Sequence, residues 1–107
     1  MEIGNAIKVT VLFPLFDNDG NPFDREAWSW FLDELVRLGE LGFDFTELGR
    51  TEGSWRGHTD RCRWIVTVVR GEEQVEEIRR FLREARVKFR QEVMYLDYHP
   101  VHFELVK

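Results

Sequence analysis

The chain has 107 residues, of which 43% are hydrophobic and 33% charged, and its formal net charge at pH 7 is -5. A chain of this length buries roughly two-thirds of its unfolded surface, so residues 1–107 are expected to fold as one domain and not to stay disordered. The negative charge argues against sequence-independent binding of nucleic acid, which relies on cationic side chains that neutralise phosphates.

Cysteine usage and hydropathy indicate the compartment. Cys62 is the single cysteine, so an internal disulfide is excluded and the cytoplasm, a reducing compartment, is expected. No apolar run approaches the ~20 residues that cross a bilayer, so we expect no membrane partner. Two basic groups still leave room for an anionic small ligand. They are Arg50, Arg56, Arg61 and Arg63, and then Arg79, Arg80, Arg83, Arg86, Lys88 and Arg90.

The first third of the chain predicts a strand and a helix. Apolar residues alternate over residues 7–15, the pattern of a half-buried strand, and residues 17–22 form a turn. A helix follows an N-cap at Asn21 or Asp24 and ends at Gly39 or Gly42. Trp30 lies about 200° around this helix from Trp28, so it packs on a further element or meets another subunit. The apolar face of the helix is predicted to hold Trp28, Phe31, Leu32, Leu35 and Val36.

The middle of the chain predicts two strands joined by a polar loop. Residues 43–48 form a short strand that Gly49 closes, and residues 50–60 form the loop. Residues 62–69 are rich in β-branched and aromatic side chains. Both faces of this strand carry apolar residues, so we expect a central strand that is covered on both sides.

The last third predicts a second helix and two short strands. The helix begins at Gly71, and an ion pair between Glu76 and Arg80, four residues apart, is expected on its solvent-exposed face. Residues 91–96 form the fourth strand, residues 97–100 a turn and residues 101–105 a short final strand. The apolar stripe of the helix consists of Val75, Ile78, Leu82, Ala85 and Phe89.

The order strand, helix, strand, strand, helix, strand predicts an α+β, ferredoxin-like βαββαβ fold. Its antiparallel sheet has two helices on one face and a short extra C-terminal strand. The opposite face is too apolar for open water, so we expect a homo-oligomer, a dimer or trimer, that assembles through it with help from residues 101–106. This face is predicted to hold Thr10, Leu12, Thr46, Leu48, Ile65 and Thr67.

Residues 35–53 resemble the layout of nitrogen-regulatory PII-like proteins. The likeness rests on Leu38-Gly39, Leu41-Gly42, Thr46-Glu47 and Gly49, followed by a loop, a Val-rich strand and a Glu-rich helix. It implies a ferredoxin-like trimer whose loop between the second and third strands contacts partners and nucleotides. The family's glycine- and lysine-rich nucleotide segment after the second helix is replaced here by residues 85–92, so we expect no cofactor.

Two short motifs are similar to a family of small bacterial proteins of unknown function. One is Trp55-Arg56-Gly57 in the loop, and the other is residues 89–94, Phe-Arg-Gln-Glu-Val-Met. The resemblance implies a shared importance for the loop and for the pair Gln91 and Glu92, and it implies no activity.

A metal site is one interpretation of the loop. His58, Asp60 and Cys62 are two residues apart, so they share one face of an extended segment and, with His99 or His102, would suit zinc. The alternative has Asp60 paired with a loop arginine and Cys62 buried as a small apolar residue. We favour the alternative and expect no metal.

An enzyme is the second interpretation. His58 would act as general acid or base, Asp60 or Glu92 would orient it, and Arg56 or Arg63 would receive an anionic substrate. The sequence contains no nucleophile motif, glycine-rich phosphate loop or paired-acid signature, so we expect catalysis less than binding.

The third interpretation, a binding or regulatory module, requires fewer specific residues than the other two. Trp55 and Tyr95 would supply flat apolar contacts, and Arg56 and Arg63 would hold a carboxylate or phosphate. Gln91 and Glu92 would bond polar edges of the ligand. The 50–63 loop would thus bind an anionic small molecule or a protein partner, while a purely structural or assembly role is the remaining alternative.

Overall fold

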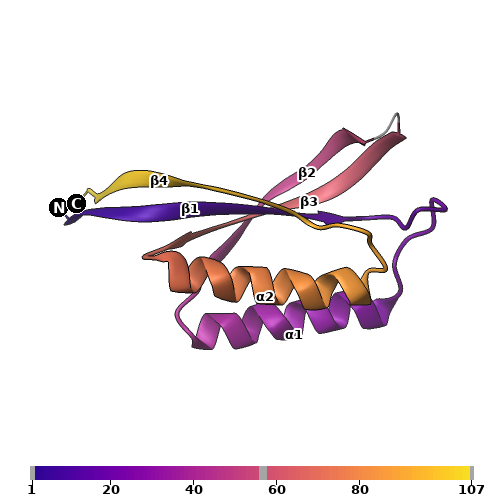
Figure 1. Cartoon of the computed structure of the whole chain (residues 1–107), viewed down its shortest axis with the longest axis horizontal. Coiled ribbons are helices and arrows are strands. Elements are labelled where there is room, and N and C mark those ends of the chain that lie inside the picture. Colours follow the sequence, from indigo (N-terminus) through magenta and orange to yellow (C-terminus); the bar gives the residue numbers. More distant parts are fainter. Residues whose placement is uncertain (1, 56–57, 107) are drawn as a thin grey trace.

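The computed structural model describes residues 2–55 and 58–106, although the side chains of residues 2, 3, 48, 50–55 and 58–60 lie outside this description. It confirms the α+β class. The elements follow the order β1 (Glu2–Pro14), α1 (Arg25–Glu40), β2 (Phe45–Trp55), β3 (His58–Val69), α2 (Glu72–Lys88) and β4 (Tyr95–Leu105). The four strands form one antiparallel sheet, and both helices lie along the same face of it (Figure 1). This arrangement is compatible with a ferredoxin-like fold.

The strand order is β2-β3-β1-β4, so β1 and β3 form the centre of the sheet. Their pairing runs from Ile7 opposite Val69 to Pro14 opposite Cys62. Beyond Cys62, β3 pairs with β2 alone, up to Trp55 opposite His58. The far part of β2 and β3 is therefore a two-stranded arm that projects beyond β1 and away from the helices (Figure 1).

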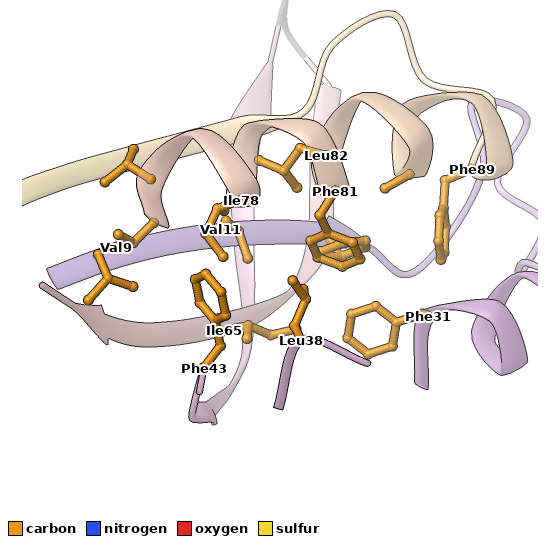
Figure 2. Close-up of a cluster of buried hydrophobic side chains, with 14 of the residues drawn as sticks. Val9, Val11, Phe31, Leu38, Phe43, Ile65, Ile78, Phe81, Leu82 and Phe89 are labelled. Carbon is orange, nitrogen blue, oxygen red and sulfur yellow. The ribbon is translucent and has the colours of Figure 1, made fainter. Parts of the chain in front are cut away.

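The core fills the space between the sheet and the helices (Figure 2). Val9, Val11 and Phe13 alternate along β1 and are at most 2% exposed. The register places Ile65 opposite Val11 and Thr67 opposite Val9, so these two residues also face the helices. The prediction that Ile65 and Thr67 lie on the opposite face is wrong. The register of β3 with β1 determines which of its side chains face the helices, and the alternation within β3 alone does not show it.

The helix α1 begins and ends as its capping residues require. The side chain of Asp24 accepts a hydrogen bond from the backbone N–H of Ala27 at 2.9 Å. At the other end Gly42 has a φ of +97°, while Phe43 N–H bonds the carbonyl of Leu38, a Schellman closure. Both Asp24 and Gly42 were among the predicted boundaries.

The buried face of α1 differs from the predicted one. Leu32 and Val36 are 54% and 64% exposed, so their predicted place in the core is wrong. The helix is rotated toward α2, which buries Ala27, Phe31 and Leu38. The ring of Trp30 stacks on Phe81 of α2 at 5.7 Å between centroids. Trp30 thus packs on a further element of the same chain, one of its two predicted alternatives.

The apolar stripe of α2 is confirmed, since Val75, Ile78, Leu82, Ala85 and Phe89 are all at most 5% exposed. The predicted pair between Glu76 and Arg80 is wrong. Arg80 bonds Glu77, and Glu76 bonds Arg79 and Arg83. Three- and four-residue separations both bring helical side chains together, so spacing alone does not select the partner.

The C-terminal segment is one long strand and not two short ones. β4 pairs continuously with β1 from Tyr95 opposite Leu12 to Leu105 opposite Glu2. The turn predicted at residues 97–100 and the extra final strand are therefore wrong. Pro100 is tolerated because β4 is an edge strand, where a missing N–H need not disrupt a second ladder.

Residues 50–55 and 58–60 of the segment predicted as a polar loop belong to strands β2 and β3. β2 does not end at Gly49 but continues to Trp55 through a bulge between Glu47 and Gly49, where φ is +120° at the glycine. A glycine in this conformation permits a bulge and a change of direction without ending the strand. The polar residues after it form the projecting arm.

Candidate functional site

The predicted site begins on the arm formed by β2 and β3. The backbone places Trp55 and His58 as the last paired residues of the two strands. The side chains of Trp55, His58 and Asp60, and residue Arg56 altogether, lie outside the described residues. Their roles in binding, or in catalysis for His58 and Asp60, stay predictions.

Arg63 lies where the arm joins the core. Its Nε and Nη2 donate to the two carboxylate oxygens of Glu47, each at 2.9 Å. The guanidinium carbon lies 4.8 Å from the ring centroid of Trp28 and 5.0 Å from that of Phe31. An external anion at Arg63 would therefore compete with a bidentate internal carboxylate. The structure gives Arg63 a role in covering the aromatic core that sequence spacing did not reveal.

Gln91 and Glu92 follow the end of α2. The side-chain amide of Gln91 donates to the backbone carbonyl of Phe89 at 2.8 Å, and the backbone carbonyl of Gln91 accepts from the guanidinium of Arg86 at 3.4 Å. Glu92 is exposed. Gln91 thus satisfies a backbone group at the end of α2 with its own side chain.

Tyr95 opens β4 and is 51% exposed. Its hydroxyl donates to the carboxylate of Asp97 at 2.7 Å. This hydrogen bond, together with the negative charge of Asp97, raises the pKa of the Tyr95 phenol above its ordinary value. The Tyr95 hydroxyl thus already has an internal acceptor in Asp97, and it loses its proton less readily than a free phenol does.

The predicted strand residues do not converge on one point. Tyr95 and Trp64 are both register partners of Leu12, so they share the face turned away from the helices, whereas Arg63 is opposite Phe13 on the helix side. Because successive residues alternate between faces, Arg63 and Tyr95 lie on opposite sides of the sheet. A single ligand of small size cannot touch both.

The metal interpretation stays untested, because the side chains of His58 and Asp60 lie outside the described residues. Among the described residues, no group of three His, Cys, Asp or Glu side chains is placed to hold an ion. His99 pairs with Lys8 and shares the face of Cys62, while the Nδ1 of His102 lies 2.6 Å from the amide oxygen of Asn5.

Neither described helix combines the length and apolarity that a bilayer-spanning helix needs.

We call the sheet face turned away from the helices the open face, and the sequence predicts it as an assembly surface. The residues that β3 presents on it are Trp64, Val66 and Val68, in place of the predicted Ile65 and Thr67. Trp64 and Val68 are 39% and 49% exposed on it. The alternation of Cys62, Trp64, Val66 and Val68 was the available signal, but it was attributed to a strand covered on both sides. The apolar and aromatic residues of the open face are Leu12, Trp64, Val66, Val68, Tyr95, Val101 and Phe103.

No protein-family model, no curated protein and no solved structure matches this chain.

Proposed function

We propose that the chain is a ferredoxin-like binding or regulatory module of the cytoplasm that self-associates through the open face of its sheet. In this proposal the arm at residues 50–63 engages an anionic small molecule or a protein partner. The single observation that carries the proposal is the apolar open face, because two helices cover only one side of the sheet.

The open face has the character of a contact surface. Trp64 and Val68 of central strand β3 and Tyr95 of edge strand β4 remain 39 to 51% exposed. Leu12 of β1 lies between Trp64 and Tyr95 in the register. The same face also carries Lys8, Asp97 and His99, so apolar and polar groups are mixed on it, as they are in most interfaces between subunits. A second copy of the same face would cover it with identical side chains, and such an isologous contact closes as a dimer.

The arm supports the binding part of the proposal. It extends past β1, and the carbonyl of Arg61 accepts the N–H of Leu15 at 2.9 Å at its base. The guanidinium of Arg61 lies 5.9 Å from the ring centroid of Phe16. An exposed extension that carries arginines and is anchored on central strands is where recognition residues commonly lie.

Native mass spectrometry of the purified protein tests both parts in one spectrum. We expect a multiple of the chain mass, dimer or trimer, and an additional mass from a retained anion. Arg56→Gln should keep the subunit number but lose the retained mass, whereas Arg25→Gln, an exposed arginine at the start of α1, should keep both.

A monomer at micromolar concentration would contradict the assembly. A retained mass that is unchanged in Arg56→Gln would contradict the role of the arm. An oligomer without any retained mass would leave a protein partner as the occupant of the arm.

A further inference from the structure

We propose that a groove between α2 and β4 binds a small amphipathic carboxylate, meaning a carboxylate with an apolar tail. Arg79, Arg83 and Arg86 of α2 would hold the carboxylate, and Leu82, Met94 and Leu96 would receive the tail. These six residues line a hollow of about 220 Å³. The site is separate from the arm, so this proposal does not rest on the one above.

The three arginines follow one stripe of the helix. They are spaced at four and then three residues, which places their side chains one above another on one side of α2. Arg79 also spans the groove, because its Nη2 donates to the hydroxyl of Tyr98 on β4 at 2.9 Å and its guanidinium lies 5.4 Å from that ring. The cationic rim therefore joins the helix to the edge strand.

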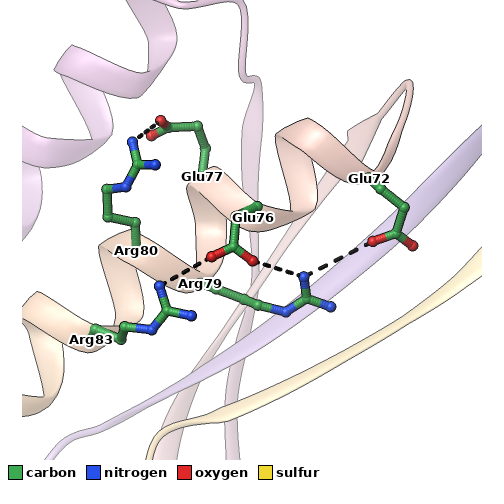
Figure 3. Close-up of polar contacts among 6 residues, drawn as sticks. All are labelled: Glu72, Glu76, Glu77, Arg79, Arg80 and Arg83. Atoms are coloured by element: carbon green, nitrogen blue, oxygen red, sulfur yellow. Dashed lines mark hydrogen bonds and ion pairs between the residues drawn. The ribbon is translucent and has the colours of Figure 1, made fainter.

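The rim has more donors than internal partners. Glu76 accepts from Arg79 at 3.0 Å and from Arg83 at 3.1 Å, and Glu72 lies 3.9 Å from Arg79 (Figure 3). Arg86 donates to the backbone carbonyl of Gln91 at 3.4 Å, and it forms no ion pair with any carboxylate whose side chain the structure describes. Since a guanidinium has five N–H donors, Arg83 and Arg86 retain donors for a further anion.

The floor explains why the ligand needs an apolar part. Leu82 is 5% exposed and belongs to the core, while Leu96 of β4 and Met94, which directly precedes β4, pack against the core. A methionine adapts to different apolar shapes. A fully polar anion would not displace water from the apolar side chains of the floor. A neutral apolar molecule would not accept hydrogen bonds from the guanidinium groups. The volume is below the roughly 300 Å³ at which drug-sized pockets begin, so the ligand is small.

Octanoate is a suitable probe, and methyl NMR spectra locate it. In a titration of the full chain we expect the methyl signals of Met94, Leu82 and Leu96 to shift in a saturable way. Arg86→Gln should weaken octanoate binding about tenfold, because a charge-assisted hydrogen bond is lost. Arg80→Gln is the matched control: Arg80 pairs with Glu77 and does not line the groove, so its affinity should be unchanged.

A second variant should act in the opposite direction. Glu76→Gln removes the carboxylate that bonds Arg79 and Arg83, so it should tighten octanoate binding several-fold. Octylamine has the same tail and a cationic head, and it should not shift the Met94 methyl signal.

Three results would overturn the proposal. They are equal losses in Arg86→Gln and Arg80→Gln, equal binding of octylamine, and shifts that centre on Val68 of the open face in place of Met94. Arg56→Gln should bind octanoate as the unmodified chain does, which separates a failure here from a failure of the arm.

Discussion

At the scale of single residues, the hydroxyl of Thr67 is the clearest unpaired group. Thr67 is 3% exposed, and its Oγ1 is the one buried side-chain oxygen or nitrogen among the described residues without a hydrogen-bond partner. A buried hydroxyl without a partner costs about 1 to 3 kcal/mol. Thr67→Val keeps the shape and removes the polar atom, so it should raise the free energy of unfolding by about 1 kcal/mol. Urea denaturation measures this change.

The control for this substitution lies on the adjacent central strand. Thr10 is 7% exposed but belongs to the open face, and its hydroxyl is not both buried and unpartnered. Thr10→Val should therefore change the free energy of unfolding by less than Thr67→Val does. Equal gains in both variants would mean that β-propensity, and not the orphaned hydroxyl, sets the effect.

At the scale of elements, the bulge at Gly49 determines where β2 turns toward the arm. The φ of Gly49 is +120°, a backbone conformation that glycine adopts without strain and that is strained for any residue with a Cβ. Gly49→Ala should lower the free energy of unfolding by about 1 to 3 kcal/mol. In contrast, Gly39→Ala in the last turn of α1 meets open space and should stabilise the protein by up to about 1 kcal/mol. Thermal unfolding compares the two, and a neutral Gly49→Ala would contradict the strain.

The sequence predicted elements where a local period is strong and failed where pairing decides. The stripe of α2 needs only helical spacing, so Val75, Ile78 and Phe89 were placed correctly. The continuity of β4 through Pro100 depends on its being an edge strand, which local composition does not show. The same holds for the candidate site: alternation fixes which residues share a face, but only the register separates Arg63 from Tyr95.

At the scale of the molecule, the uneven covering of the sheet predicts how stability depends on concentration. If two open faces bury each other, unfolding is linked to dissociation, and each tenfold rise in protein concentration adds about 1.4 kcal/mol. The Tm of the unmodified chain should then rise by a few degrees over that interval. Differential scanning calorimetry at several concentrations measures it.

Val68 is the residue through which this linkage is best broken. It is 49% exposed on central strand β3, and Val68→Lys would place a second ammonium directly opposite Lys8, which two packed sheets cannot solvate. Its Tm should become independent of concentration. Val87→Lys is the matched control, because Val87 is 65% exposed on α2, away from the open face, and its variant should retain the full dependence. Since a folding defect in Val68→Lys would lower Tm at every concentration alike, the slope and not the absolute Tm carries the result. A slope that survives in Val68→Lys but disappears in Val87→Lys would move the interface from the sheet to the helices.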